Sequence, residues 1–251
     1  IMERLVGSEM CIRDRSCGNS GSGIQMIYAD NSYISIDDIS ITDNGYGAFF
    51  KQSSGSITNS VININCAAVN TNGFKQTGSI KHTLVIDDNT LTTAEGAGIT
   101  AYDQARISAS RNTISGAEQG SGIAIRSSTA DLYYNNIGPI GGFNGLWIYG
   151  TSEVTAIGNN ITNTGKEAVV HGEYHYRDSG WPSIAPSESR LYMENNMIDN
   201  NSGTCNSEKM YGGDFQCPAI HIFRASATLY NNVVKNNICL LYTSPSPRDV
   251  P

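Results

Sequence analysis

The sequence predicts an all-β solenoid, in which short parallel strands stack along one axis. One observation is a unit that recurs at a period of about 24 residues, which is the signature of a repeat architecture. The other is that polar turns divide each unit into three short apolar stretches with no helical stripe. This combination favours a coil of parallel strands over a β-sandwich.

Each copy of the unit ends in an aliphatic residue. Eight copies end at Ile41, Ile64, Leu91, Ile114, Ile137, Ile161, Ile198 and Val234. The position seven residues earlier is apolar in all eight copies, and the position five residues earlier is polar only at Asn59. Apolar residues at alternate positions predict strands that bury one face.

An asparagine stands two residues before the closing aliphatic residue in six consecutive copies, at Asn89, Asn112, Asn135, Asn159, Asn196 and Asn232. Ile39 and Ile62 occupy this position in the first two copies. Asparagine tolerates a left-handed backbone, and stacked amide side chains can hydrogen-bond to one another. We therefore expect these six residues to form one column at a corner, each in left-handed or bridging backbone geometry.

A weaker apolar stretch precedes each copy and is usually led by glycine, as in Gly98-Ile99 and Gly122-Ile123. Successive side chains of a strand point to opposite faces. In the most regular rungs we expect an inward set of Ile99, Ala101, Ile123, Ile125, Leu146 and Ile148. The outward set is then Tyr102, Arg126, Trp147 and Tyr149.

The repeat resembles that of the right-handed parallel β-helix proteins of the pectin-lyase-like superfamily, over roughly residues 22–237. The resemblance implies a right-handed parallel β-helix of about eight rungs, truncated at both ends. It also implies that the asparagine corner joins the second and third strands, and that the outer face of the glycine-led first strand borders a substrate groove. None of the catalytic signatures of the family's pectin methylesterases, polygalacturonases or pectate lyases is found in the sequence, so the resemblance implies no catalytic residue.

Both ends of the chain resemble translated sequencing-adapter DNA. A back-translation of residues 5–14 has a reverse complement that encodes residues 240–248 in another frame. We therefore expect residues 1–15 and 239–251 to be non-native tails. Residues 16–238 would form one β-helix domain with insertions at 172–189 and 200–218. This span would be an internal fragment of a longer gene, whose partners include further rungs or domains of the parent chain.

The net charge of −7 and the lack of basic clusters argue against nucleic acid or an anionic membrane as a partner, and no membrane span is found in the fragment. The cysteine spacing contains no CxxC pair, which argues against a zinc knuckle. A metal site at His171 and His175 would need a third ligand, and we expect no metal site and no cofactor. Cys205 and Cys217 flank the second insertion, where a secreted protein would place a disulfide, although two free thiols are the alternative. The states of Cys17 and Cys66 are left open.

The outward residues Tyr102, Arg126, Trp147 and Tyr149 are candidates for binding sugar. Sugar rings stack their C–H faces on aromatic side chains, while arginine bonds hydroxyls or carboxylates. The alternative is that these aromatic residues pack under neighbouring loops. The insertions add four further aromatic candidates, Tyr174, Tyr176, Trp181 and Tyr211.

Acid and base groups gather in and after the two insertions. The candidates for catalysis are His171, Glu173, His175, Arg177, Lys209, His221 and Arg224. The direction of His171 is ambiguous, because Ala168, Val169 and Val170 precede it without alternation. Histidine is the most plausible general base, since its ordinary pKa lies near neutrality.

These features predict an extracellular or cell-surface β-helix module that binds polysaccharide along its first-strand face. Carbohydrate processing near the insertions, by a polysaccharide lyase or a glycoside hydrolase, is an open extension of this hypothesis. The alternative is a structural or adhesive stalk segment of a large surface protein with no catalytic activity.

Overall fold

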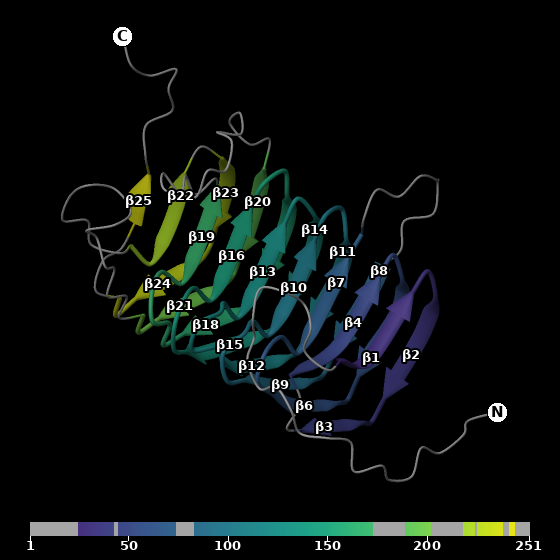
Figure 1. The fold of residues 1–251 in the computed structure, drawn as a ribbon. Helices are drawn as coiled ribbons and strands as arrows, with labels where there is room; N and C mark the ends of the chain where they lie inside the picture. The colour runs from purple at the N-terminus through teal and green to yellow at the C-terminus, as the bar shows by residue number, and fades with distance from the viewer. Residues whose placement is uncertain are drawn as a thin grey trace, which may run out of the picture.

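The computed structural model describes residues 25–42, 45–73, 83–172, 189–201, 218–223, 225–237 and 241–243. These residues form parallel strands in three sheets, and each turn of the chain contributes one strand to each sheet (Figure 1). The sequence order of the rungs is therefore also their order along the axis. Within these ranges no helix is long and apolar enough to cross a membrane.

The first sheet has nine strands in the order β1 (Gln25–Asp30), β4 (Tyr46–Lys51), β7 (Val69–Asn72), β10 (Ile99–Tyr102), β13 (Ile123–Arg126), β16 (Leu146–Tyr149), β19 (Val169–Gly172), β22 (Ile220–Phe223) and β25 (Leu241–Thr243). The second has eight, namely β2 (Tyr33–Asp37), β5 (Ser54–Thr58), β8 (Thr83–Asp87), β11 (Arg106–Ser110), β14 (Thr129–Tyr133), β17 (Glu153–Ile157), β20 (Arg190–Glu194) and β23 (Ser226–Tyr230).

The third sheet also has eight strands, namely β3 (Ser40–Thr42), β6 (Val61–Ile64), β9 (Thr90–Thr93), β12 (Thr113–Gly116), β15 (Asn136–Ile140), β18 (Asn160–Thr162), β21 (Met197–Asp199) and β24 (Val233–Lys235). The prediction of a parallel β-helix with eight rungs is confirmed. Residues 241–243, which lie within the segment that we expected to be a tail, form β25 beside β22. The other expected tail, residues 1–15, lies outside the described residues.

The interior is a continuous apolar core that runs the length of the coil. The inward residues of the regular rungs, including Ile99, Ile107, Ile114, Ile123 and Ile125, are fully buried. Burial alternates along β11, which carries Ile107, whereas β10 and β13 also bury the residue between their two inward positions. The expected inward set of the first strands is buried in full.

The expected register of the second rung is wrong by two residues. Ile62, rather than Ile64, pairs with both Ile41 and Leu91 in the third sheet. Ile57 then takes the inward position that we assigned to Asn59. Because side chains alternate with a period of two, a shift by two residues leaves every side chain on the same face, so the apolar pattern fits both registers.

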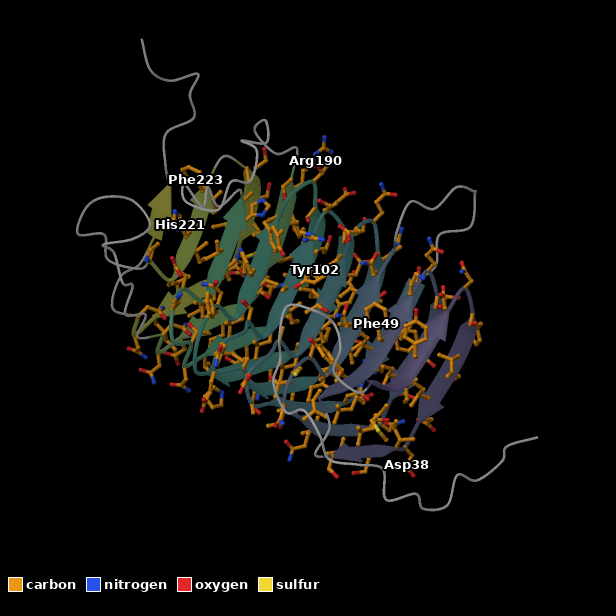
Figure 2. All side chains as sticks on the ribbon, in the orientation of Figure 1. Asp38, Phe49, Tyr102, Arg190, His221 and Phe223 are labelled. Atoms are coloured by element: carbon orange, nitrogen blue, oxygen red, sulfur yellow. The ribbon has the colours of Figure 1, made fainter. Side chains whose placement is uncertain are left out.

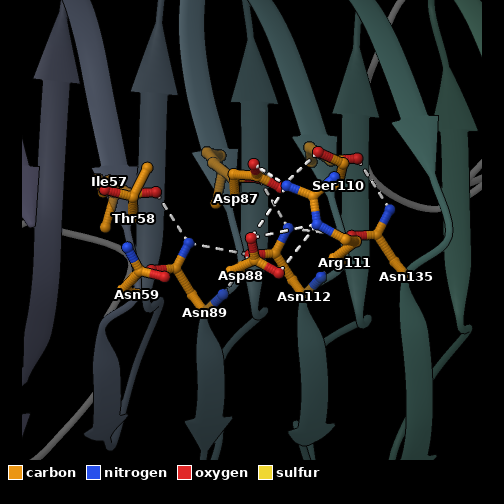
Figure 3. Close-up of polar contacts among 12 residues, drawn as sticks. Ile57, Thr58, Asn59, Asp87, Asp88, Asn89, Ser110, Arg111, Asn112 and Asn135 are labelled. Atoms are coloured by element: carbon orange, nitrogen blue, oxygen red, sulfur yellow. Dashed lines mark hydrogen bonds and ion pairs between the residues drawn. The ribbon is translucent and has the colours of Figure 1, made fainter. Parts of the chain in front are cut away.

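The six asparagines stack in one column at the corner between the second and third sheets. Figure 3 labels Asn89, Asn112 and Asn135 of this column. The Nδ2 of Asn112 donates to Oδ1 of Asn135 at 3.0 Å and to the carbonyl oxygen of Ile86 at 2.8 Å. Its own Oδ1 accepts from the backbone N–H of Asn89 at 3.0 Å and from Nδ2 of Asn89 at 2.9 Å. Each buried amide therefore joins three successive rungs.

The expectation of a left-handed backbone at these asparagines is wrong. The positive φ angle falls on the residue just before each one, for example 54° at Asp88, 53° at Arg111 and 56° at Tyr134. The preceding residue makes the corner, so the backbone N–H of the asparagine itself can point along the axis to the next rung. The same arrangement occurs at the third corner, where Asn200 (φ 53°) precedes Asn201 and the Asn201 backbone N–H donates to Oδ1 of Asn237 at 2.9 Å.

The glycines that lead the first strands allow a close contact with the third sheet. A Cβ atom at Gly122 would lie 2.5 Å from Cγ2 of Ile137 and 2.8 Å from the carbonyl oxygen of Gly145. Equivalent overlaps with the isoleucine of the same rung occur at Gly98 and Gly145. The absence of a side chain is therefore what lets the third strand pack against the start of the first strand of the same rung.

The asparagine column can be tested by Asn112→Ala. The substitution leaves the buried N–H of Asn89 and carbonyl of Ile86 without these partners, and each such group costs about 1–3 kcal/mol. We expect chemical denaturation to show a loss of about 2–5 kcal/mol in the free energy of unfolding. Asn63→Ala, at an exposed position of β6, is the control and should change it by less than about 0.5 kcal/mol. Equal losses would contradict the role of the column.

The glycine contact can be tested by Gly122→Ala, which should lower the free energy of unfolding by about 1–3 kcal/mol through overpacking. Gly141→Ala is a matched control, because its added Cβ would lie 3.5 Å from the nearest atoms, an ordinary contact. Thermal unfolding of the two variants should therefore separate them clearly. A Gly122→Ala protein as stable as Gly141→Ala would show that the close approach is not required.

Candidate functional site

The register of the first sheet places its outward side chains in two columns along the axis. One column contains Tyr28, Phe49, Asn70, Thr100, Ala124, Trp147, Val170 and His221. The other contains Asp30, Lys51, Asn72, Tyr102, Arg126 and Tyr149. We call these two columns the outer face. Figure 2 labels Phe49, Tyr102 and His221 along this sheet.

Aromatic side chains stack at two places on the outer face. Trp147 and Tyr149 lie two residues apart on β16 and so share a face, and their ring centroids are 4.4 Å apart with an interplanar angle of 21°. Tyr28 and Phe49 stack across adjacent strands at 5.6 Å and 16°. Trp147, Tyr149 and Phe49 are half-buried, whereas Tyr28 is 52% exposed. Flat aromatic surfaces are therefore present on β1 and β4 and again on β16.

Arg126 lies between these stacks and has several partners. Its Nη2 donates to Oδ1 of Asp103 at 2.8 Å and to Oδ2 at 3.0 Å. Its guanidinium carbon lies 4.8 Å from the ring centroid of Tyr102, and it also hydrogen-bonds to Tyr149. Asn72 donates to Oδ2 of Asp103 at 3.2 Å. The cation is thus held by an acid and two tyrosines.

The two tyrosine hydroxyls beside Arg126 remain protonated over the physiological pH range. Burial raises the pKa of Tyr149 well above its usual value, and the neighbouring Tyr102 adds to this effect. Burial likewise raises the pKa of Tyr102, although the hydrogen bond with Tyr149 and the charge of Arg126 lower it in part. Both side chains are therefore neutral groups that can donate a hydrogen bond.

A buried acid–imidazole pair lies near the last rungs of the outer face. The Nδ1 atom of His221 is 3.6 Å from Oε1 of Glu167, and the two side chains are 5% and 3% exposed. Asn144 donates to Oε2 of Glu167 at 2.9 Å and is itself buried. His221 was a sequence candidate, but Glu167 and Asn144 were missed. The sequence feature that could have identified them is their shared position in the repeat, because each lies two residues before a first strand, Glu167 before β19 and Asn144 before β16.

Hydrogen bonds keep Glu167 ionised despite its burial. Burial alone raises the pKa of this carboxyl group, but hydrogen bonds from His221, from the backbone and from Asn144, together with the charge of His221, outweigh it. The net pKa lies below the usual value. A charged carboxylate is therefore part of the folded structure.

The direction of His171, which the sequence left open, is inward, so this candidate does not join the outer face. His171 pairs with Ile148 and Ile222, which face inward, and Val170 takes the outward position beside Trp147. The histidine is fully buried, and its Nε2 lies 3.0 Å from the carbonyl oxygen of Ser226. Burial lowers its pKa, so it is a neutral group of the interior.

The remaining sequence candidates lie outside the described residues. These are Glu173, His175, Arg177, Lys209 and Arg224 among the charged groups, Tyr174, Tyr176, Trp181 and Tyr211 among the aromatic groups, and the expected disulfide partners Cys205 and Cys217. Cys66 is the single cysteine within the described ranges, and it is buried and disulfide-bonded. Across the same ranges, no group of three or more His, Cys, Asp or Glu side chains could hold a metal ion.

The stacked rungs and their asparagine column define a β-helix repeat protein. The family model described as a right handed beta helix region matches residues 4–137, and the chain belongs to this family. No curated protein matches the sequence. Among solved structures, the A-module of the Azotobacter vinelandii mannuronan C-5 epimerase AlgE4 is similar at 10% identity and a TM-score of 0.39, covering 87% of this chain and 74% of that chain. Similarity of this degree does not bear on activity.

The pair of Glu167 and His221 predicts an acid-sensitive contribution to stability. Because the folded pKa of Glu167 is below its usual value of 4.5, the stabilisation is complete above that pH and is lost as the pH falls through the folded pKa. We expect the melting temperature of Glu167→Gln to lie well below that of the wild type at pH 7. The difference between the two melting temperatures should be smaller at acidic pH. Glu153→Gln, at an exposed position of β17, should show no such change. A gap that is the same at both pH values would exclude this role for Glu167.

Proposed function

We propose that this chain is a carbohydrate-binding β-helix module that holds an extended polysaccharide along its outer face. The observation that carries the proposal is the stack of Trp147 on Tyr149, in line with Tyr102 and Arg126 on the neighbouring strands. An aromatic ring offers a flat apolar surface, which suits the C–H face of a pyranose. A polysaccharide lying along the axis would meet successive rungs.

The polar groups around the aromatic residues support the same proposal. The hydroxyls of Tyr102 and Tyr149 and the amide of Asn72 can donate and accept hydrogen bonds, as sugar hydroxyls do. Strands in a sheet are spaced by about 4.8 Å, which is close to the length of one sugar residue in an extended chain. Equivalent side chains on successive strands would therefore face successive sugars.

The proposal is restricted to binding. The acid–imidazole pair near this face, Glu167 and His221, is nearly fully buried, so a sugar cannot reach either group in this conformation. A lyase or hydrolase would need such a group within hydrogen-bond distance of the reacting atom. Binding requires only the exposed parts of the aromatic residues.

We further propose an extracellular or cell-surface location. Disulfides persist in oxidising compartments and are rare in the cytosol, and Cys66 is disulfide-bonded. A glycan-binding surface also belongs where polysaccharides are found. Both arguments point to the same side of the cell envelope.

A structural stalk is the second candidate function. The half-burial of Tyr102, Trp147 and Tyr149 favours it, because aromatic residues that pack mainly against one another stabilise a surface without binding anything. The continuous core and the amide columns would suit an elongated spacer. The two functions differ in whether the aromatic residues contact a ligand.

The proposal predicts that Trp147→Ala weakens glycan binding about tenfold or more, since a lost stacking contact of about 1.4 kcal/mol corresponds to a tenfold change in Kd. Binding to a panel of neutral and acidic polysaccharides would be measured by glycan array and then by calorimetry. Tyr33→Ala removes an aromatic residue that is 75% exposed on the second sheet, and it should bind as the wild type does. A wild-type protein that binds no polysaccharide would favour the stalk.

A further inference from the structure

The cations of the outer face, Lys51 and Arg126, are each paired with an acid, which is Asp30 of the same face for Lys51 and Asp103 at the corner after β10 for Arg126. Nζ of Lys51 lies 2.9 Å from Oδ2 of Asp30, and Nη2 of Arg126 lies 2.8 Å from Oδ1 of Asp103. These four described groups sum to no net charge. One further cation, Lys166, lies in the turn before β19. Its Nζ is 3.7 Å from the ring centroid of Phe143, and the next residue in the chain is the acid Glu167.

Asp103 is fixed in place by three rungs of the coil. Its backbone N–H donates to the carbonyl oxygen of Arg126 at 3.1 Å, so the acid is tied to the strand that carries its partner. Its side chain also accepts from Asn72 on the rung before. The φ angle of 53° places it at the corner that follows β10. The carboxylate is therefore held over the guanidinium by the backbone as well as by charge.

This geometry bears on which glycans the outer face can take. A uronate carboxylate would need a cation, and Arg126 is the cation that the aromatic stack brings nearest to a bound sugar. To pair with it, the uronate would have to displace Asp103 or lie beside it, and two adjacent carboxylates repel each other. The chain as a whole carries a net charge of −7, which adds to the repulsion.

We propose that Asp103 makes the outer face selective for neutral polysaccharides, by occupying the arginine that would otherwise bind a uronate. This inference rests on the proposed function and adds the substrate class to it. Asp103 is a specificity-determining residue here, since it would act by excluding acidic ligands. Selectivity of this kind depends on repulsion of the wrong ligand as much as on attraction of the right one.

The test compares polymers that differ only in charge. Suitable pairs are glucose oligomers with glucuronic acid oligomers of the same linkage, and galacturonan with its methyl ester. We expect the wild type to bind the neutral member of a pair at least about tenfold more tightly. Asp103→Asn should gain about tenfold in affinity for the acidic member at low salt, and the gain should shrink as salt screens the charge. Its affinity for the neutral member should stay within about threefold.

Asn is the appropriate substitution because it tolerates the left-handed backbone at this corner. Asp88→Asn is the matched control. Asp88 has a φ of 54°, and it also accepts from the arginine of the next rung, Arg111, but at the corner between the second and third sheets. Asp88→Asn changes the net charge by the same amount as Asp103→Asn, but it does so away from the outer face. It should therefore leave uronate binding unchanged.

The outcomes separate the two proposals. A wild type that binds the acidic member as well as the neutral one would overturn the selectivity while leaving the binding function in place. Failure of Asp103→Asn to gain uronate affinity, or an equal gain in Asp88→Asn, would also overturn the role of Asp103. Absence of binding to every polymer would overturn the proposed function itself. If Asp103→Asn does not fold, the wild-type comparison alone still decides the preference.

Discussion

The fold depends on the hydrogen bonds that a buried amide makes between rungs. In a single rung a corner leaves a backbone N–H and a carbonyl pointing along the axis, away from water, and each must find a partner. The column from Asn89 to Asn232 supplies these partners at the second corner. Ser128 and Asn201 supply them at the first and third corners. Once these contacts fix the corners, the strands between them are in register.

Much of the fold could be predicted from the sequence, because every rung needs the same hydrogen-bond partners at its corners. An amide at one position in six successive copies, with aliphatic residues at fixed distances, predicts the stack and its core. The register of rung two could not be predicted, since Ile62 and Ile64 both face inward and satisfy the same pattern. The left-handed residue was also misplaced, because very different side chains, such as Arg111 and Tyr134, occupy that position. Asp88, Gly158, Asn195 and Asn231, which favour a left-handed backbone, occupy the position in the other four rungs, but the two exceptions obscure the pattern.

The site was less predictable than the fold for a related reason. Alternation along a strand correctly places Tyr102, Arg126 and Trp147 on the outer face, but it does not show which neighbour each contacts. Asp103, the partner of Arg126, is 23 residues earlier and follows a strand instead of lying in one. Glu167 was missed because a charged residue before an apolar strand ordinarily reads as part of an exposed turn. The direction of His171 could not be predicted, because Val169 and Val170 precede it and hide the alternation.

The asparagine column also has a direction. From Asn89 to Asn196, each side-chain amide donates to the side-chain oxygen of the next asparagine in the column, so these amide–amide hydrogen bonds all run the same way along the axis. Hydrogen bonds arranged head to tail polarise one another. A break at a central rung therefore divides the column into two shorter and weaker series, whereas a break at an outer rung removes only one member. An asparagine with the same local contacts therefore contributes more to the stability of the fold in the middle of the column than at its ends.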